Sequence, residues 1–334
     1  MRKPIPVLVL AGFLGSGKTT LLNHLLGRGL GQRIGVIVND FGSVGVDAML
    51  IGGQASGMVS VGNGCLCCVT DEQGVAPMLE QLARPAADID VIVIEASGIA
   101  EPGALVQLVL NARHPATVFG GLVEVLDAAE FEATRLRHPE LDRHVELADL
   151  IVLNKADRVE DEAVARISEL CRAVNGHAPI VPCVNGAVNP GMLFDIEAVP
   201  GRQLLLGQLD DDDHSGHLHA SYQAVSFVTD KPVDPRWLVE LIDERPVGTY
   251  RVKGFVYFGV PGYRQRFTLH AVGRYLRFDR SAWPSGQPRR TSLELIGSGF
   301  DPEALRRALR SCERAEPAGR DSMLAVARYL FTAS

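Results

Sequence analysis

The stretch Gly12-Phe13-Leu14-Gly15-Ser16-Gly17-Lys18-Thr19 decides the fold of the N-terminal half. It matches the full Walker A pattern, with the apolar run Ile5–Leu10 before it and the helical pattern Thr19–Leu26 after it. Its glycines let backbone amides turn inward around phosphates, Lys18 supplies a charge for the β/γ oxygens, and Thr19 offers a hydroxyl to Mg²⁺. A glycine turn that binds nothing is the alternative, and the correct flanking strand and helix argue against it.

Composition narrows the possible classes of protein. A length of 334 residues predicts about two domains, each with its own core. The hydrophobic share of 46% and charged share of 22% are typical of a globular protein, and no segment approaches the roughly 20 apolar residues that span a bilayer. The formal net charge of −7 provides no basic field for general nucleic-acid binding. We therefore expect neither membrane insertion nor nucleic-acid binding.

The first twelve residues, MRKPIPVLVLAG, imitate a secretory leader. Their apolar run passes directly into the phosphate loop, which needs a buried strand at this point. We therefore interpret the run as that strand and expect a cytoplasmic, reducing location. In such a location the six cysteines are thiols or metal ligands and not disulfides.

Apolar runs alternate with helical patterns up to about residue 200. The expected strands are Val7–Ala11, Ile34–Val38, Val91–Glu95, Leu122–Leu126, Leu150–Leu153 and Ile180–Val184. The expected helices include Thr19–Leu26, Glu72–Ala83 and Glu162–Val174. Runs rich in Val, Ile and Leu with helices between them predict a doubly wound α/β domain, residues 1–200, whose mostly parallel sheet is covered on both faces.

A second, smaller α+β domain is expected over residues 222–334, after a linker at 201–221 that is charged, carries histidines and has no periodicity. The predicted strands are Tyr222–Thr229, Val252–Phe258 and Arg266–His270. The predicted helices are Pro235–Glu244, Pro302–Ser311 and a last one at Ser322–Phe331.

The tetrapeptide Asn154-Lys155-Ala156-Asp157 follows the strand at Leu150 and has the form N-K-x-D. A carboxylate there can accept hydrogen bonds from guanine N1 and its exocyclic amine, a donor pair that adenine lacks, so GTP or GDP is preferred over ATP. A solvated turn is the alternative for an isolated tetrapeptide, and the Walker A loop makes it weaker. Cys183-Val184-Asn185-Gly186, after the next strand, is a further candidate for packing on the base. The predicted nucleotide-binding residues are Gly12, Gly15, Ser16, Gly17, Lys18, Thr19, Thr20, Gly98, Asn154, Lys155 and Asp157.

Glu95 ends the buried run Val91–Glu95, the position at which a Walker B carboxylate orients Mg²⁺. We expect Thr19 and Glu95 to hold magnesium, and the Gly98 amide to sense the γ-phosphate, which makes Glu95–Pro102 a candidate switch. An acid that only caps the next helix is the alternative. The predicted catalytic set is Lys18, Glu95 and Asp40, and no general base for water is evident.

Three thiols lie within four residues, at Cys65, Cys67 and Cys68. Thiolates at that density suit Zn²⁺, Cu(I) or Co²⁺, and one short loop supplies three ligands while leaving a position open for release. A buried turn of small residues and a redox pair are the alternatives.

The chain resembles the CobW family of P-loop GTPases, which is related to the nickel-enzyme chaperones HypB and UreG. The resemblance rests on GFLGSGKTT, NDFGSVGVD, GNGCLCC, EASGIAEP and LNKAD in that order, and on Val252-Lys253-Gly254 and Asp279–Pro284 in the second domain. It implies a slow GTPase with a coupled metal site, a metallochaperone or insertase that delivers zinc or cobalt to a client metalloprotein. The family usually has E-N-E-F-G-E where this chain has Val38-Asn39-Asp40-Phe41-Gly42-Ser43, which leaves Asp40 and Asp47 as the nearby acids and puts added oxygen ligands in doubt.

The linker concentrates acid at Asp210–Asp213 and imidazole at His214, His217 and His219. These histidines are candidates for collecting divalent ions, with a solvated linker as the alternative. The other histidines are isolated and interpreted as structural, and the remaining cysteines are interpreted as core residues. The residues concerned are His24, His114, His138, His144, His177 and His270, with Cys171, Cys183 and Cys312.

Two rival functions remain at this point, and a homodimer is compatible with the sequence. A small-molecule kinase also uses a Walker A loop, although the N-K-x-D loop argues against it. A zinc buffer or sensor would bind the ion through the thiols and histidines, with GTP turnover incidental.

Overall fold

The computed structural model describes residues 3–27, 32–38, 57–60, 74–98, 100–194, 222–244 and 246–331, and for 57–60 and 222 it describes the backbone alone. The chain divides into two compact units, Met1–Asn175 with Ile180–Ala220 and Gly176–Pro179 with Ser221–Ser334. No helix among the described residues is long and apolar enough to cross a bilayer.

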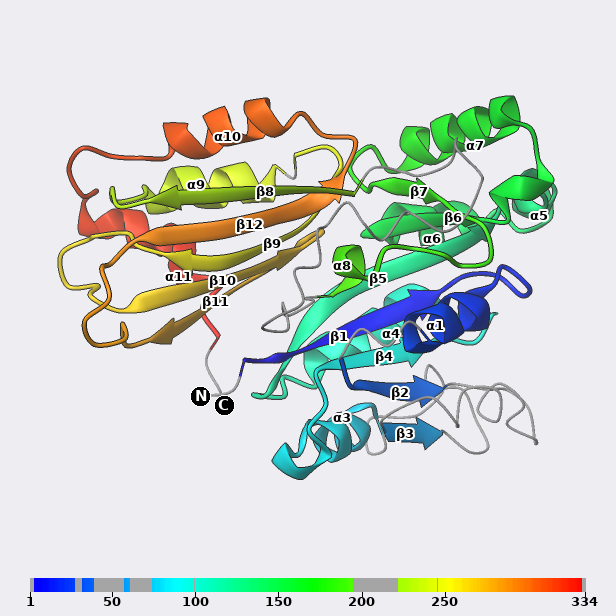
Figure 1. The fold of residues 1–334 in the computed structure, drawn as a ribbon, viewed down its shortest axis with the longest axis horizontal. Helices are drawn as coiled ribbons and strands as arrows, with labels where there is room; N and C mark the ends of the chain where they lie inside the picture. Colours follow the sequence, from blue (N-terminus) through cyan, green and yellow to red (C-terminus); the bar gives the residue numbers. More distant parts are fainter. Residues whose placement is uncertain are drawn as a thin grey trace. The chain divides into compact units, whose positions relative to one another are not determined.

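The first unit is built on a seven-stranded sheet in the order β3-β2-β4-β1-β5-β6-β7, with every pair of neighbours parallel (Figure 1). The strands are β1 (Ile5–Ala11), β2 (Ile34–Val38), β3 (Gly57–Ser60), β4 (Val91–Glu95), β5 (Thr117–Asp127), β6 (Leu150–Asn154) and β7 (Ile180–Pro182). The helices are α1 (Lys18–Gly27), α3 (Ala76–Ala83), α4 (Pro102–Asn111), α5 (Phe131–Arg137), α6 (Leu141–Leu147), α7 (Asp161–Val174) and α8 (Pro190–Leu193), with short 3-10 helices at Pro85–Ala87 and Ala156–Arg158.

Continuous burial of the central strands accounts for this architecture. Every residue of β2, β4 and β6 is buried, as is nearly every residue of β1 and β5, so both faces of the sheet are covered. The predicted doubly wound, mostly parallel fold is confirmed. The predicted strand at Ile180–Val184 is too long, because β7 ends at Pro182 and the chain turns through left-handed Asn185 and Gly186. β3 is a strand that the sequence analysis did not predict.

The carboxyl ends of parallel strands share one edge of a sheet, and ligands of such folds bind outside that edge. The loops after β1, β4, β5, β6 and β7 therefore meet at one edge. This edge carries the described part of the predicted nucleotide site.

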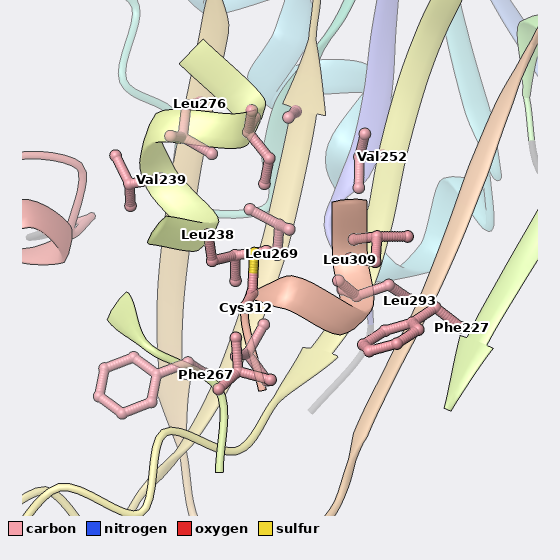
Figure 2. Close-up of a cluster of buried hydrophobic side chains, with 14 of the residues drawn as sticks. Phe227, Leu238, Val239, Val252, Phe267, Leu269, Leu276, Leu293, Leu309 and Cys312 are labelled. Atoms are coloured by element: carbon pink, nitrogen blue, oxygen red, sulfur yellow. The ribbon is translucent and has the colours of Figure 1, made fainter. Parts of the chain in front are cut away.

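The second unit contains an antiparallel five-stranded sheet in the order β11-β10-β9-β12-β8. Its strands are β8 (Tyr222–Thr229), β9 (Thr249–Val256), β10 (Arg266–Val272), β11 (Tyr275–Ser281) and β12 (Thr291–Ser298). Helices α9 (Pro235–Asp243) and α10 (Pro302–Ser311) place side chains such as Leu238 and Leu309 over strand residues such as Phe267, Leu269 and Leu293 (Figure 2). This is the predicted smaller α+β fold.

Aspartates precede α9 and α10, each just before a proline. Asp234 accepts hydrogen bonds from the amides of Arg236 and Trp237, at 2.9 and 3.4 Å, and its other oxygen accepts two from Arg314, at 2.9 and 2.8 Å. Asp301 caps α10 in the same way but is exposed. The two caps fix where the helices start.

The predicted helix at Ser322–Phe331 is wrong in extent. The chain forms a 3-10 turn at Arg320–Met323 and a short α11 at Leu324–Ala327, and then hydrogen-bonds to β11. Phe278 donates its amide to Tyr329 O at 2.9 Å and accepts from Phe331 N at 2.9 Å. These strand-like bonds end the helix. β11 and β12 were not predicted, and β9 runs from Thr249 to Val256 where Val252–Phe258 was expected.

Candidate functional site: a phosphate loop joined to a base loop

The loop between β1 and α1 has the backbone that its glycines permit. Gly12, Gly15 and Gly17 have φ values of 147°, 75° and 102°. At Gly12 a side chain would also collide with the carbonyl of Val125 on β5. The loop therefore lies directly against the sheet edge and leads into the first turn of α1, where backbone amides point outward and favour anions.

Lys18 lies over this loop and is 8% exposed. Its ammonium donates to the carbonyls of Gly12 at 2.8 Å and Phe13 at 3.4 Å, which places the charge inside the concave side of the loop. The Ser16 hydroxyl is buried and has no hydrogen-bond partner among the described residues. A loop with a positive φ pattern, an inward lysine and an unpartnered hydroxyl fits a polyphosphate.

Thr19 and Glu95, predicted from separate motifs, are brought together. The Thr19 hydroxyl donates to Glu95 Oε1 at 2.6 Å, and Glu95, at the end of β4, is only 4% exposed. A hydroxyl and a carboxylate beside a phosphate loop form the oxygen donor set that Mg²⁺ takes. The pair fits the predicted magnesium site. The contact of Glu95 with Thr19 does not support the alternative in which Glu95 only caps the next helix.

The segment after β4 lies against the phosphate loop. The amide of Ala96 donates to Leu10 O at 2.9 Å, and a Cβ at Gly98 would lie 2.9 Å from the backbone nitrogen of Leu14 and 2.7 Å from its side chain. The two loops are thus in van der Waals contact. This contact gives the predicted switch segment, Glu95–Pro102, a direct path to the phosphate loop.

The N-K-x-D loop is hydrogen-bonded to the phosphate loop by two of its side chains. Asn154 is 1% exposed and donates to Ser16 O at 2.9 Å. Lys155, which has a φ of 57°, donates to Gly15 O at 2.7 Å and to Asp127 at 2.6 Å. The sequence analysis missed Asp127, although it directly follows the predicted strand at Leu122–Leu126.

Asn154 also joins the loop after β7. Its side-chain oxygen accepts from the Gly186 amide at 3.0 Å and from the Cys183 thiol at 3.5 Å, while the Ala156 amide donates to Cys183 O at 3.1 Å. Asp157 beside them is exposed. The phosphate loop, the N-K-x-D loop and the Cys183–Gly186 loop therefore form one connected unit, with an exposed carboxylate available to a base.

A cavity of about 350 Å³ lies between the phosphate loop, the end of β5 and α5. Phe13, Leu14 and Lys155 line it together with Arg137 and Arg158. The Phe13 ring also contacts the ring of His138, with centroids 4.7 Å apart, so this histidine is not isolated. Of the predicted nucleotide residues, Thr20 is exposed in the first turn of α1.

The predicted transition-metal ligands Cys65, Cys67 and Cys68, the linker residues His214, His217 and His219, and Asp40 of the predicted catalytic set lie outside the described residues. Within the described residues no group of three His, Cys, Asp or Glu side chains is placed to hold a metal. The other cysteines are buried free thiols, as expected. Burial raises the pKa of Cys171 and Cys183 to about 12 and that of Cys312 to about 11.

Comparison with known proteins agrees with this architecture. Residues 6–182 match the family model described as CobW/HypB/UreG, nucleotide-binding domain, and residues 222–313 match the cobalamin synthesis protein cobW C-terminal domain. The zinc chaperone CobW of Pseudomonas aeruginosa is 33% identical over 92% of this chain and 91% of its own length, and the zinc chaperone YjiA of Escherichia coli is 30% identical over 86% and 84%. Zn(II)-bound YjiA GTPase from E. coli superposes over 94% of this chain and 100% of its own, with 23% identity and a TM-score of 0.45. The chain belongs to the CobW family.

Proposed function

We propose that this protein binds GTP, hydrolyses it slowly to GDP and phosphate, and uses the cycle to deliver zinc, or cobalt, to a client metalloprotein. The observation that carries the nucleotide part is the joining of Asn154 and Lys155 to the carbonyls of Ser16 and Gly15. These bonds hold the proposed guanine-binding loop beside the proposed phosphate-binding loop, which supports the binding of one nucleotide by both.

In this proposal each described residue has a definite task. Lys18 exchanges its carbonyl partners for the β/γ oxygens, and loop and α1 amides bind the remaining phosphate oxygens. Thr19 and Glu95 hold Mg²⁺, which when bound offsets the phosphate charge. Asp157 accepts from guanine. Asp40 is proposed to complete the catalytic set.

The metal part of the proposal rests on the thiols of Cys65, Cys67 and Cys68 and on the relatives named zinc chaperones. These cysteines follow β2 and β3 in the sequence, and β2 ends at Val38, the neighbour of Glu95 across the sheet. Nucleotide and metal occupancy are then coupled, and such coupling acts equally in both directions. The linker histidines are proposed as an accessory collecting site.

Turnover measurements test the nucleotide part. Purified protein with Mg²⁺ should release phosphate from GTP and much less from ATP, and Lys18→Ala should abolish the release. Phosphate that appears on an added metabolite and not in water would instead identify a kinase.

Complementation tests the delivery part. A strain without this protein, grown at limiting zinc, should recover client activity with the wild-type chain and fail with Lys18→Ala. Equal recovery by both would identify a zinc buffer and contradict GTP-driven delivery.

A further inference from the structure

A fully buried carboxyl group lies beside the nucleotide site, and the proposed chemistry does not use it. Glu124 on β5 is 0% exposed, and neither of its carboxyl oxygens has a hydrogen-bond partner among the described residues. Its neighbour across the sheet is Ala11, the residue that immediately precedes the phosphate loop. An isolated ionised carboxyl group in such surroundings costs several kcal/mol, so a compensating charge or a proton is required.

His144 supplies that compensation from α6. It is 8% exposed; its Nδ1 lies 3.8 Å from Glu124 Oε1, and its Nε2 lies 3.7 Å from Glu101 Oε2. Both distances exceed a direct hydrogen bond and are short enough for strong charge interaction. The imidazole therefore lies between a buried carboxyl group and a half-exposed one.

Glu101 connects this pair to the candidate switch. It is the residue before Pro102, where α4 begins, and its side chain makes no capping hydrogen bond to that helix. Its carboxyl group is directed instead to α6, where Arg143 is 3.6 Å away and His144 is 3.7 Å away. Both α4 and α6 pack on β5 and on each other.

The surroundings favour a charged imidazole. Burial lowers the pKa of His144, but Glu124, Glu101 and Glu140, the residue before α6, together raise it above its ordinary value. Burial raises the pKa of Glu124. The interactions with His144 and with the charge of Lys18 lower it, but by less than burial raises it.

Two further groups face this cluster among the described residues. Arg143 lies beside Glu101, and the Cys171 thiol on α7 has a pKa raised mainly by burial and, to a smaller extent, by the charge of Glu124. The pKa of His144 is raised on folding, so its protonation stabilises the folded state. This contribution to the free energy of unfolding is fully present below the ordinary pKa of histidine and is lost as the pH rises through the pKa of the folded state.

We propose that His144 is a positioning residue for the nucleotide site: as an imidazolium held by buried Glu124, it fixes Glu101 and with it the segment Glu95–Pro102. When the imidazolium loses its proton, the charged partner left to Glu101 among the described residues is Arg143, whose side chain is 71% exposed and screened by solvent. The segment that packs on Leu14 is then held less firmly, and GTP binding weakens. The effect on GTP rests on the proposed function, whereas the His144–Glu101 link itself does not.

The link is tested first in nucleotide-free protein. Histidine NMR titration should give His144, assigned by its absence in His144→Gln, a pKa above the ordinary value, and Glu124→Gln should lower it. Hydrogen exchange at matched pH should show the segment 96–108 less protected in His144→Gln than in wild type below that pKa and equally protected above it. His114→Gln, which changes a histidine in the turn between α4 and β5, should match wild type throughout.

Glu101→Gln provides a second variant that leaves Glu124 and His144 paired, in case His144→Gln does not fold. It should lower the pKa of His144 and reduce protection of the same segment. An ordinary or lowered pKa for His144, or unchanged protection in Glu101→Gln, would overturn the proposal.

GTP affinity as a function of pH completes the test. From about pH 6 to pH 9, the GTP affinity of wild type and of His114→Gln should fall roughly three- to tenfold more than that of His144→Gln. The pH profile of His144→Gln lacks this step because it has no imidazole to titrate. Parallel profiles for wild type and His144→Gln would overturn the positioning role. If no variant binds GTP at any pH, the proposed function fails, and the NMR and exchange results still decide whether His144 holds Glu101.

Discussion

Asn154→Ala removes the side chain that joins three loops of the nucleotide site. In the structure this amide donates to Ser16 O at 2.9 Å and accepts from Gly186 N at 3.0 Å and from the Cys183 thiol at 3.5 Å. Asn154 is 1% exposed, and the two bonds to backbone groups are buried. Ser16 O and Gly186 N would each lose a buried partner.

The expected cost follows from those two groups. A buried backbone group left without its partner costs about 1–3 kcal/mol, so Asn154→Ala should lower the free energy of unfolding by about 2–6 kcal/mol. A second effect concerns binding alone. Because the phosphate loop and the Cys183–Gly186 loop are no longer held together, ordering them should reduce GTP affinity by about 1–3 kcal/mol, or roughly 5- to 150-fold.

Asn175→Ala is the matched control. Asn175 is also a buried asparagine of the same unit, 5% exposed, and its amide donates to the carbonyls of Val145, Glu146 and Ala148 at 2.8, 3.2 and 2.9 Å. It touches neither nucleotide loop in these bonds. Urea unfolding should show comparable losses for both variants. Isothermal titration at a temperature where both are folded should show a much larger loss of GTP affinity in Asn154→Ala than in Asn175→Ala, whose bonds hold the end of α6.

Two results would refute this reasoning. Equal GTP affinity in Asn154→Ala and wild type would mean that the bond between the loops does not organise the site. Equal weakening in the two variants would mean that the loss reflects general destabilisation and not the connection of these loops.

Three further predictions concern other parts of the structure. Gly98→Ala should weaken GTP binding, measured by titration, because its Cβ would press on Leu14; Leu14→Ala in the same chain should recover part of the loss, and no loss at all would contradict the contact. Asp234→Ala should lower the free energy of unfolding by about 3 kcal/mol, since it removes a helix cap and two hydrogen bonds from the half-exposed Arg314 guanidinium. The exposed cap variant Asp301→Ala should cost about 1 kcal/mol, and similar urea midpoints for the two variants would contradict this difference. The three buried cysteines should resist thiol reagents at pH 8, because thiols with pKa values of about 11 to 12 leave a thiolate fraction of only about one in a thousand or less; peptide mapping after labelling of native protein checks this, and modification of any of them would contradict their burial.

The local motifs predicted the fold, and the strand ends and loops on which the candidate nucleotide residues lie, because each motif carries its own geometry. The Walker A loop requires a strand before it and a helix after it. Strands of a parallel sheet that are buried on both faces appear in the sequence as continuous apolar runs, so β2 and β4 were predicted with their observed limits. Glu95 was chosen by the same reasoning, because the last residue of a buried parallel strand lies at the sheet edge where ligands bind.

Long-range partners could not be predicted in this way. The contact of Thr19 with Glu95 spans 76 positions, and that of Asn154 with Ser16 spans 138, so neither distance follows from a local pattern. His144 was interpreted as an isolated structural histidine because Glu124 and Glu101, which flank it in space, lie on other elements. The strands β11 and β12 lack the continuous apolar run that marked the parallel strands. From Thr291 to Leu295 β12 does alternate buried and partly buried residues, a signal of a half-buried strand that the sequence analysis missed.

The measurement that tests the central claim most directly is the zinc dissociation constant of the protein loaded with a non-hydrolysable GTP analogue and with GDP. If nucleotide and metal are coupled, the two constants should differ by about fivefold or more, and adding zinc should change the affinity for the analogue by the same factor. Cys67→Ala should weaken zinc binding in both states while leaving nucleotide binding to metal-free protein unchanged. Identical zinc constants in the two nucleotide states would contradict GTP-driven delivery, even in a protein that hydrolyses GTP.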